Sequence, residues 1–229
     1  MMGLESREER VPWTLRQALV LILFINLFQL AISLVGKNYL DKVMDFNLLS
    51  LLDALLYIGG VYAFVRFKAK GGWVDLGLHT RKLLRSILAG TFTGFVTAIT
   101  VLLAGYLMVR LIGEEPSAQQ VQEVARQAQG LWQISLFLVI ASLIVPIKEE
   151  LVFRGFIYPA FRDRVGVTWG IILTAVFFSL VHGDLIRFIP LLIGGIALNI
   201  VYQRTGSLYS SIVAHGVWNG IMGVLAFWR

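Results

Sequence analysis

The stretch LWQISLFLVIASLIVPIKEELVFRGF, residues 131–156, joins an almost purely apolar run to a dense group of charges. Lys148, Glu149, Glu150 and Arg154 follow within a few residues of a segment that is apolar enough to lie in lipid. A charged side chain inside hydrocarbon costs about 3 kcal/mol or more unless it is paired or hydrated. We therefore expect a membrane helix to end or turn near residue 147, and these charges to have a specific role.

The composition of the whole chain is that of an integral membrane protein. Its 229 residues have a mean hydropathy of +0.76, and 15% of them are charged, against about 25% in soluble domains. About 20 helical residues cross a hydrocarbon core of about 30 Å. Seven apolar runs are predicted to do so: 13–35, 46–66, 83–112, 130–147, 166–183, 186–203 and 207–228.

The predicted fold class is all-α, a polytopic bundle of about seven transmembrane helices. The apolar runs lack the two-residue alternation of a membrane β-barrel, and a helix satisfies its own backbone hydrogen bonds in lipid. Residues 1–129 are predicted to supply the N-terminal spans and loops. Residues 130–229 are predicted to form the core of the same integrated membrane domain.

The distribution of Lys and Arg predicts a cytoplasmic N-terminus. With that orientation most basic residues fall on inner segments, as the positive-inside rule requires. The net charge of +6 is then explained by loops that face anionic lipid, and no nucleic-acid partner is expected. The absence of cysteine excludes a disulfide framework and a thiolate nucleophile.

Two stretches are predicted to lie outside the membrane, residues 68–82 and residues 113–130. The second favours a helix after Pro116 and is expected to form an amphipathic surface helix or a cap over the bundle. Gly90 and Gly94 form a small-xxx-small pair that is typical of close helix packing. Asp53 is interpreted as an interfacial residue hydrated from the outer side.

The ionisable and polar residues within or at the mouth of predicted spans are the functional candidates. They are Asp53, Lys148, Glu149, Glu150, Arg154, His182 and His215, with the amides Asn199 and Asn219. Glu150 and Arg154 are four residues apart and are predicted to form an ion pair. Glu149 lies about 100° around the helix from Glu150, so that pair does not explain it.

Two further pairs share the four-residue spacing, and each has a structural alternative. Phe178 and His182 lie on one stripe at the end of a span, where a histidine is often structural. His215 and Asn219 share a face of the last span, where they could simply join helices by hydrogen bonds.

Taken together, three motifs resemble a known family. EELVFR (149–154) fits Glu-Glu-x-x-x-Arg, FSLVH (178–182) fits Phe-x-x-x-His, and HGVWN (215–219) fits His-x-x-x-Asn. Their order on successive helices resembles the CAAX prenyl protease and bacteriocin-processing (CPBP, or Abi) family of intramembrane endopeptidases. The resemblance covers about residues 130–228.

The resemblance implies a membrane-embedded CAAX-type endopeptidase. It implies that Glu149, helped by His182, is the general base for the attacking water, and that His215 and Asn219 stabilise the oxyanion. Glu150 is counted with these catalytic candidates as the residue that orients the base, supported by Arg154 and Phe178. The expected substrate is a membrane-anchored, prenylated or bacteriocin-like peptide in a prokaryotic plasma membrane.

Alternatives remain open at this point. No metal cofactor is expected, because the His-Glu-x-x-His spacing is missing, but Glu149, His182 and His215 could in principle bind Zn²⁺ as in a metalloprotease. Ser179, Ser207, Ser210 and Ser211 lack a nucleophile-elbow motif and are interpreted as packing residues. A proton- or ion-coupled transporter, or a non-catalytic membrane partner in bacteriocin immunity or secretion, would use the same buried charges differently.

Overall fold

The structure, a computed structural model, describes residues 10–36, 42–113, 127–128 and 130–227, and these ranges are helical and contain no strand. The helices are α1 (Leu15–Gly36), α2 (Lys42–Ala63) with the π-helical η1 (Phe64–Lys68), α3 (Leu83–Ile112), α5 (Gly130–Val139), η2 (Ile140–Ile144), α6 (Val145–Glu150), η3 (Leu151–Ile157), α7 (Tyr158–Leu180), α8 (Phe188–Thr205) and α9 (Leu208–Phe227). The predicted all-α fold class is therefore confirmed.

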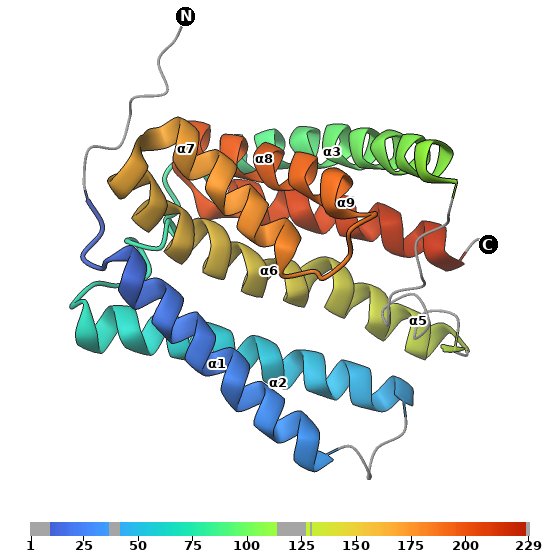
Figure 1. The fold of residues 1–229 in the computed structure, drawn as a ribbon, viewed down its shortest axis with the longest axis horizontal. Helices are drawn as coiled ribbons and strands as arrows, with labels where there is room; N and C mark the ends of the chain where they lie inside the picture. Colours follow the sequence, from blue (N-terminus) through green and yellow to red (C-terminus); the bar gives the residue numbers. More distant parts are fainter. Residues whose placement is uncertain (1–9, 37–41, 114–126, 129, 228–229) are drawn as a thin grey trace, which may run out of the picture.

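Five helical segments are long and apolar enough to cross a membrane. They are Asn47–Lys68, Leu83–Ile112, Gly130–Leu180, Phe188–Thr205 and Leu208–Phe227, and Leu15–Ala31 is a shorter apolar helix. The 51-residue segment folds back on itself at Gly166, whose φ of 81° and ψ of 171° suit glycine (Figure 1). This hairpin corresponds to two of the predicted spans, and the total of seven stays a prediction.

The helix that begins at Gly130 does not end near residue 147, so the predicted boundary of that span was wrong. It continues through η2, α6 and η3 into the start of α7. The continuation is possible because the charges after residue 147 find partners within the bundle instead of needing a water-exposed turn. The Glu-Glu-x-x-x-Arg motif consequently lies in the middle of a long helix.

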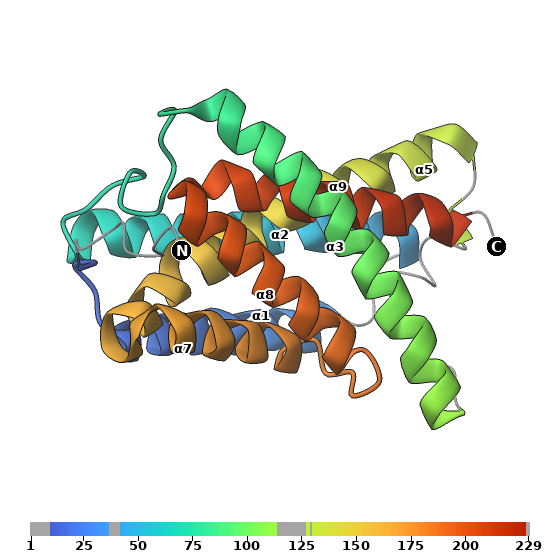
Figure 2. The ribbon, with the colours of Figure 1, turned by 90° about the horizontal axis from the view of Figure 1, so that it is seen from above.

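The helices lie in three layers, with the rod from α5 to η3 in the middle (Figure 1). The α1–α2 hairpin covers one side of this rod, and α3, α7, α8 and α9 cover the other, with α3 crossing α9 diagonally (Figure 2). The start of α1, the end of η1, the start of α3, the break at Gly166 and the α8–α9 connection share one end of the bundle. These are the segments predicted to face the cytoplasm, an orientation that stays a prediction.

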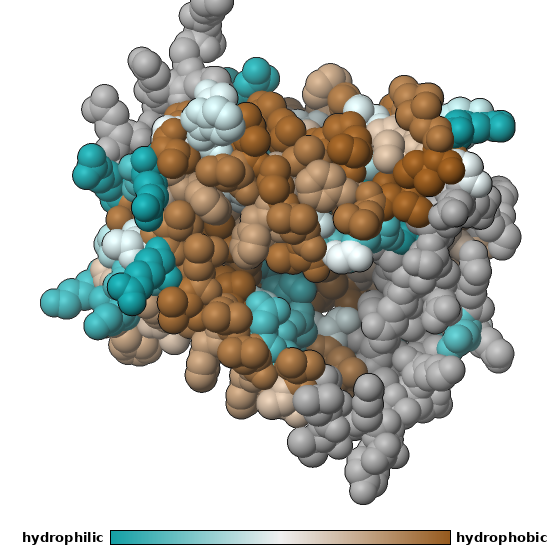
Figure 3. All heavy atoms as spheres, in the orientation of Figure 1, coloured by the Kyte–Doolittle hydropathy of each residue, from teal (hydrophilic) through white to brown (hydrophobic). Residues whose placement is uncertain are grey.

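The outer surface of the helices is apolar, as a lipid-facing surface must be (Figure 3). Phe24, Leu55 and Phe92 expose 66%, 67% and 71% of their surface, fractions that would favour aggregation of a soluble protein. The buried core instead contains aromatic residues around the middle rod, including Phe156 and Phe178. Hydrophobic side chains thus cover both the interior and the surface of the bundle.

The predicted close packing at Gly90 and Gly94 is confirmed. A Cβ atom at Gly90 would lie 2.5 Å from the Ser210 carbonyl oxygen, and one at Gly94 would lie 2.6 Å from that of Ala214. Such distances leave no room for a side chain, so the two glycines let α3 and α9 approach through their backbones.

The loop between η1 and α3 is anchored to the motif-bearing helices. Leu76 is fully buried, and a Cβ atom at Gly155 in η3 would lie 3.0 Å from its carbonyl oxygen. The amide of Leu208 donates to the Gly77 carbonyl at 2.9 Å, which ties the loop to the start of α9. The surface helix or cap predicted within 113–130 falls mostly on residues 114–126 and 129, outside the described residues.

Candidate functional site

A buried hydrogen-bonded group connects the first and third motifs. Arg154 Nη1 donates to Glu150 Oε1 at 2.8 Å, which confirms the predicted ion pair, and His215 Nδ1 lies 2.7 Å from the same oxygen. Glu150 and Arg154 are fully buried, and His215 is 2% exposed. A carboxylate paired with a guanidinium is ionised and accepts hydrogen bonds only, so His215 Nδ1 carries the hydrogen.

Arg154 also connects this group to the second motif. Its Nη2 donates to the carbonyl of Gly195 in α8 at 3.1 Å, and its guanidinium lies 4.7 Å from the centre of the Phe178 ring in α7. The backbone of α8 can come this close because Gly195 packs on Ala175, which a Cβ atom would meet at 3.1 Å. One buried cation thus contacts Glu150 on its own helix and groups on two other helices, α7 and α8.

Glu149 is arranged differently from its neighbour. Its side chain is 16% exposed, and among the described residues no donor lies within hydrogen-bonding distance of its carboxylate. Lys148 Nζ lies 3.9 Å from Oε1, and His215 Nε2 lies 3.9 Å from Oε2. Separations of this length leave the carboxylate free to bind water.

His182 lies beside Phe178 at the end of α7. Its Nδ1 is 2.6 Å from the Phe178 carbonyl oxygen, so this nitrogen carries the hydrogen and Nε2 is the accepting nitrogen of the neutral ring. The Phe178 ring lies between the two histidines, 4.7 Å from that of His182 and 5.9 Å from that of His215. His182 is close enough to act on Glu149 electrostatically, although no hydrogen bond joins them.

Asn219 is held by a backbone carbonyl that the helix itself leaves free. Pro146 has no amide hydrogen, so a carbonyl one turn earlier, in η2, lacks its helical donor. Asn219 Nδ2 donates to the Ala141 carbonyl oxygen at 3.1 Å. Only one of the two amide hydrogens is used in this bond, so the other can serve a ligand.

Gly216 allows α9 to approach η2 at the same level. A Cβ atom there would lie 2.6 Å from the carbonyl oxygen of Ser142. This close approach fixes the position of His215 and Asn219 along the axis of α6, and so their distance from its carboxylates.

The interpretation of Asp53 as an interfacial residue hydrated from the outer side stays a prediction, but the structure gives this carboxylate two partners. Its Oδ2 forms an ion pair with Lys148 Nζ at 2.6 Å, and Gln29 Nε2 donates to its Oδ1. Lys148 was a partial signal for this pair, because it is the cation that remains once Arg154 is paired with Glu150. Gln29 had no such signal, since a lone amide in an apolar span does not identify its partner.

The remaining polar candidates have structural contacts. Asn199 is buried and donates to the Ile171 carbonyl at 3.0 Å, which joins α8 to α7. Ser179, Ser210 and Ser211 donate to carbonyl oxygens of their own helices three or four residues earlier. These contacts agree with an interpretation as packing residues, whereas the hydroxyl of Ser207 is buried without a hydrogen-bond partner among the described residues.

The alternative zinc site was tested against the positions of its three residues. Among the described residues, no three His, Asp or Glu side chains are arranged to hold a metal ion. His215 Nδ1 is bonded to Glu150 and His182 Nδ1 to a carbonyl, which leaves Nε2 of each ring, the nitrogen that binds zinc when Nδ1 is held in this way. The described residues thus form no assembled three-ligand group, and the absence of a metal cofactor stays a prediction.

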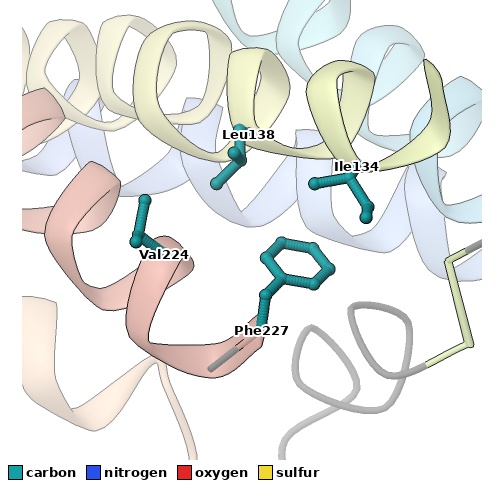
Figure 4. Close-up of a pocket in the computed structure, with 4 residues that line it drawn as sticks. All are labelled: Ile134, Leu138, Val224 and Phe227. Atoms are coloured by element: carbon teal, nitrogen blue, oxygen red, sulfur yellow. The ribbon is translucent and has the colours of Figure 1, made fainter. Parts of the chain in front are cut away.

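A hollow and a cavity interrupt the apolar surface of the bundle. Figure 3 shows hydrophilic residues around a hollow between the α7–α8 connection and α1. A separate cavity of about 440 Å³ lies at the far end of the α5–α9 seam, lined by Ile134, Leu138, Val224 and Phe227 (Figure 4). Val224 and Phe227 lie about one and two helical turns after Asn219 on α9, so the cavity lies further along the seam at which Asn219 contacts η2.

Comparison with known proteins gives one family and two bacterial relatives. A family model described as type II CAAX prenyl endopeptidase Rce1-like matches residues 131–221. The putative membrane peptidase YdiL of Bacillus subtilis is 24% identical over 131 residues, 57% of this chain and 52% of that protein. The UPF0177 protein YaiF of Lactococcus lactis is 34% identical over 90 residues, 38% of each chain.

These matches cover only part of the relatives. The chain spans about half of YdiL and less of YaiF, and no solved structure matches it. The matched residues contain all three motifs, so the family resemblance drawn from them is confirmed. The two relatives are bacterial, in agreement with the predicted prokaryotic origin.

Proposed function

Because this integral membrane protein carries the Rce1-like CAAX prenyl endopeptidase region at residues 131–221, we propose that it hydrolyses a peptide bond of a membrane-associated protein or peptide. The observation that carries the proposal is the contrast between two adjacent carboxylates. Glu150 is buried and bonded to Arg154 and His215, whereas Glu149 is partly exposed and free of hydrogen bonds from the described residues.

Glu149 is the general base in this proposal. It accepts a proton from a water molecule whose oxygen attacks the scissile carbonyl carbon. The carbonyl oxygen becomes an oxyanion as the tetrahedral intermediate forms. When the C–N bond breaks, Glu149 returns the proton to the departing amine, and the products are one carboxylic acid and one amine.

Asn219 and His215 stabilise the oxyanion. The second amide hydrogen of Asn219 is available, and such a neutral donor is typically worth about 3–4 kcal/mol in the transition state. Since Nδ1 of His215 donates to Glu150, its Nε2 carries a hydrogen only when the ring is protonated. The Glu149 carboxylate lies 3.9 Å from Nε2, on the side of the ring away from Glu150.

The other motif residues position these groups. Glu150 holds the His215 ring, and Arg154 is the buried cation that pairs with Glu150. His182, whose ring packs against that of Phe178, assists proton transfer at Glu149. No step of this proposal uses a metal ion, and activity in the presence of a chelator tests that choice.

The substrate class follows from where the site lies. A peptide must reach a group enclosed by helices whose outer surface contacts lipid, so its scissile segment is held at the membrane. A prenylated or otherwise anchored protein, or a bacteriocin-like peptide, meets this requirement. The name of YdiL, a putative membrane peptidase, supports a peptide substrate.

The test is cleavage of a library of lipidated and unlipidated peptides by the purified protein in proteoliposomes. We expect cleavage by the wild type, loss of more than a hundredfold in kcat for Glu149→Gln and His182→Ala, and full activity in the presence of a chelator. Loss with chelator that Zn²⁺ restores would replace the metal-free mechanism. If no peptide is cleaved while ion flux across the liposomes depends on Glu149, the protein is a transporter and the proposal is refuted.

A further inference from the structure

The α1–α2 hairpin lies outside the three motifs but binds Lys148, the residue next to the proposed base Glu149, through one ion pair. Asp53 in α2 binds Lys148 in α6 at 2.6 Å, and Gln29 in α1 donates to the other oxygen of Asp53. The Lys148 ammonium also lies 5.6 Å from the centre of the Tyr57 ring, on the same helix as Asp53. The side chains of Lys148 and Asp53 are 17% and 27% exposed, so the pair is largely shielded from water.

Lys148 lies between two carboxylates and is bonded to only one of them. Its ammonium is 2.6 Å from Asp53 but 3.9 Å from Glu149 Oε1. Charge-assisted hydrogen bonds between an ammonium and a carboxylate are about 2.7–2.9 Å long. A shift of the ammonium by about 1 Å would therefore bond it directly to Glu149 and occupy the oxygen that takes up the proton.

We propose that Asp53 is a positioning residue that holds Lys148 away from Glu149, so that Glu149 has a nearby cation but keeps its oxygens free. This inference rests on the proposed role of Glu149 as the base. It gives the α1–α2 hairpin a function in the reaction and assigns roles to two residues outside the three motifs.

The two substitutions that break the ion pair then have different consequences. With Asp53→Asn, Lys148 loses its stronger partner and bonds to Glu149. We expect kcat to fall about ten- to a hundredfold with KM changed less than threefold, the range that one charge-assisted hydrogen bond can produce. With Lys148→Met, no cation is left to bind Glu149, and kcat falls only a few fold.

The double variant separates positioning from simple anchoring of α2 to α6. We expect Asp53→Asn/Lys148→Met to be several times more active than Asp53→Asn alone, because the competing cation is gone. If the pair only anchors the helices, both single variants and the double variant lose activity equally and in step with their thermal stability. Equal losses of that kind would overturn the inference.

Asp163→Asn is the matched control. It also breaks an ion pair, in which Arg162 Nη2 lies 2.8 Å from Asp163 Oδ1 in α7, and it should leave kcat unchanged. Activity is measured with the wild type and Glu149→Gln in parallel. An active wild type whose Asp53 variants behave alike refutes only the inference, whereas an inactive wild type refutes the proposed function.

A measurement that needs no substrate tests the inference even if the wild type cleaves no peptide. The carboxylate stretching band of Glu149 is identified in infrared spectra by subtraction of Glu149→Gln. In Asp53→Asn it should shift as Lys148 bonds to Glu149, and it should return to the wild-type position when Lys148→Met is added. An unshifted band in Asp53→Asn would refute the inference even if no peptide is cleaved.

Discussion

Replacing Arg154 by methionine should show how strongly the buried ion pair is coupled to the fold. The substitution keeps an apolar chain of similar length but removes the 2.8 Å bond to Glu150, the 3.1 Å bond to the Gly195 carbonyl and the contact with the Phe178 ring. Glu150 would remain fully buried with only His215 as a donor. Removing one partner of a buried pair typically costs about 3–5 kcal/mol, because the other charge is left uncompensated.

A loss of that size lowers the ratio of folded to unfolded protein by roughly a hundred- to a few thousandfold. The free energy of unfolding can be measured in mixed micelles with increasing sodium dodecyl sulfate, followed by circular dichroism. Adding Glu150→Gln to the Arg154 variant removes the uncompensated charge, so we expect the double variant to recover most of the stability while remaining inactive. Arg110→Met, at an exposed position of α3, is the control and should change the stability by less than about 0.5 kcal/mol.

The reasoning fails if Arg154→Met lowers the free energy of unfolding by less than 1 kcal/mol. It also fails if the added Glu150→Gln substitution destabilises the protein further. Either result would mean that water or a rearranged side chain compensates Glu150, and that the carboxylate is not held in a dry site.

Three further substitutions test the packing and the site by the same unfolding measurement. Gly94→Ala should lower the free energy of unfolding by about 1–3 kcal/mol, because the added carbon would lie 2.6 Å from a backbone oxygen of α9. Gly105→Ala on the same helix is the control and should be neutral or stabilising, because its Cβ atom meets nothing within 4 Å. Equal effects of the two substitutions would contradict the close approach of the α3 and α9 backbones. Asn219→Ala should lower the free energy of unfolding by about 1–3 kcal/mol, because it leaves a backbone carbonyl in η2 without a donor. Adding Pro146→Ala should reduce that loss, because it restores a backbone amide that can donate to this carbonyl. Additive losses in the double variant would refute this account. Glu149→Gln should abolish cleavage but change the free energy of unfolding by less than about 0.5 kcal/mol, because no described residue is hydrogen-bonded to that carboxylate. A large destabilisation would show that Glu149 has a structural role.

The parts of the fold that could be predicted depend on local spacing. Apolar runs predict membrane helices because about 20 residues must match the thickness of the bilayer. The pairing of Glu150 with Arg154 and the close packing at Gly90 and Gly94 also follow from neighbouring positions on one helix, and both are confirmed. The motifs predict the family resemblance for the same reason, since each is a pattern of five or six residues.

Contacts between distant segments could not be predicted in this way. Asp53 and Lys148 are separated by 95 residues, and the sequence shows two charges without showing that they meet. The partner of Asn219 is a backbone carbonyl, which carries no residue-specific signal. The end predicted near residue 147 was wrong because the cost of a charge in lipid was applied to residues whose partners lie on other helices.

The π-helical turns η2 and η3 have a consequence for how this region can change during evolution. They flank α6, the six-residue segment that carries both carboxylates, and a π-turn contains one residue more than the α-helical turn it replaces. Deleting a single residue from η2 would restore regular α-helix there and rotate everything before it by about 100° relative to α6. Related proteins should therefore vary the apolar residues of η2 but keep the number of residues in it, because that number sets how the helix before η2 is rotated relative to α6.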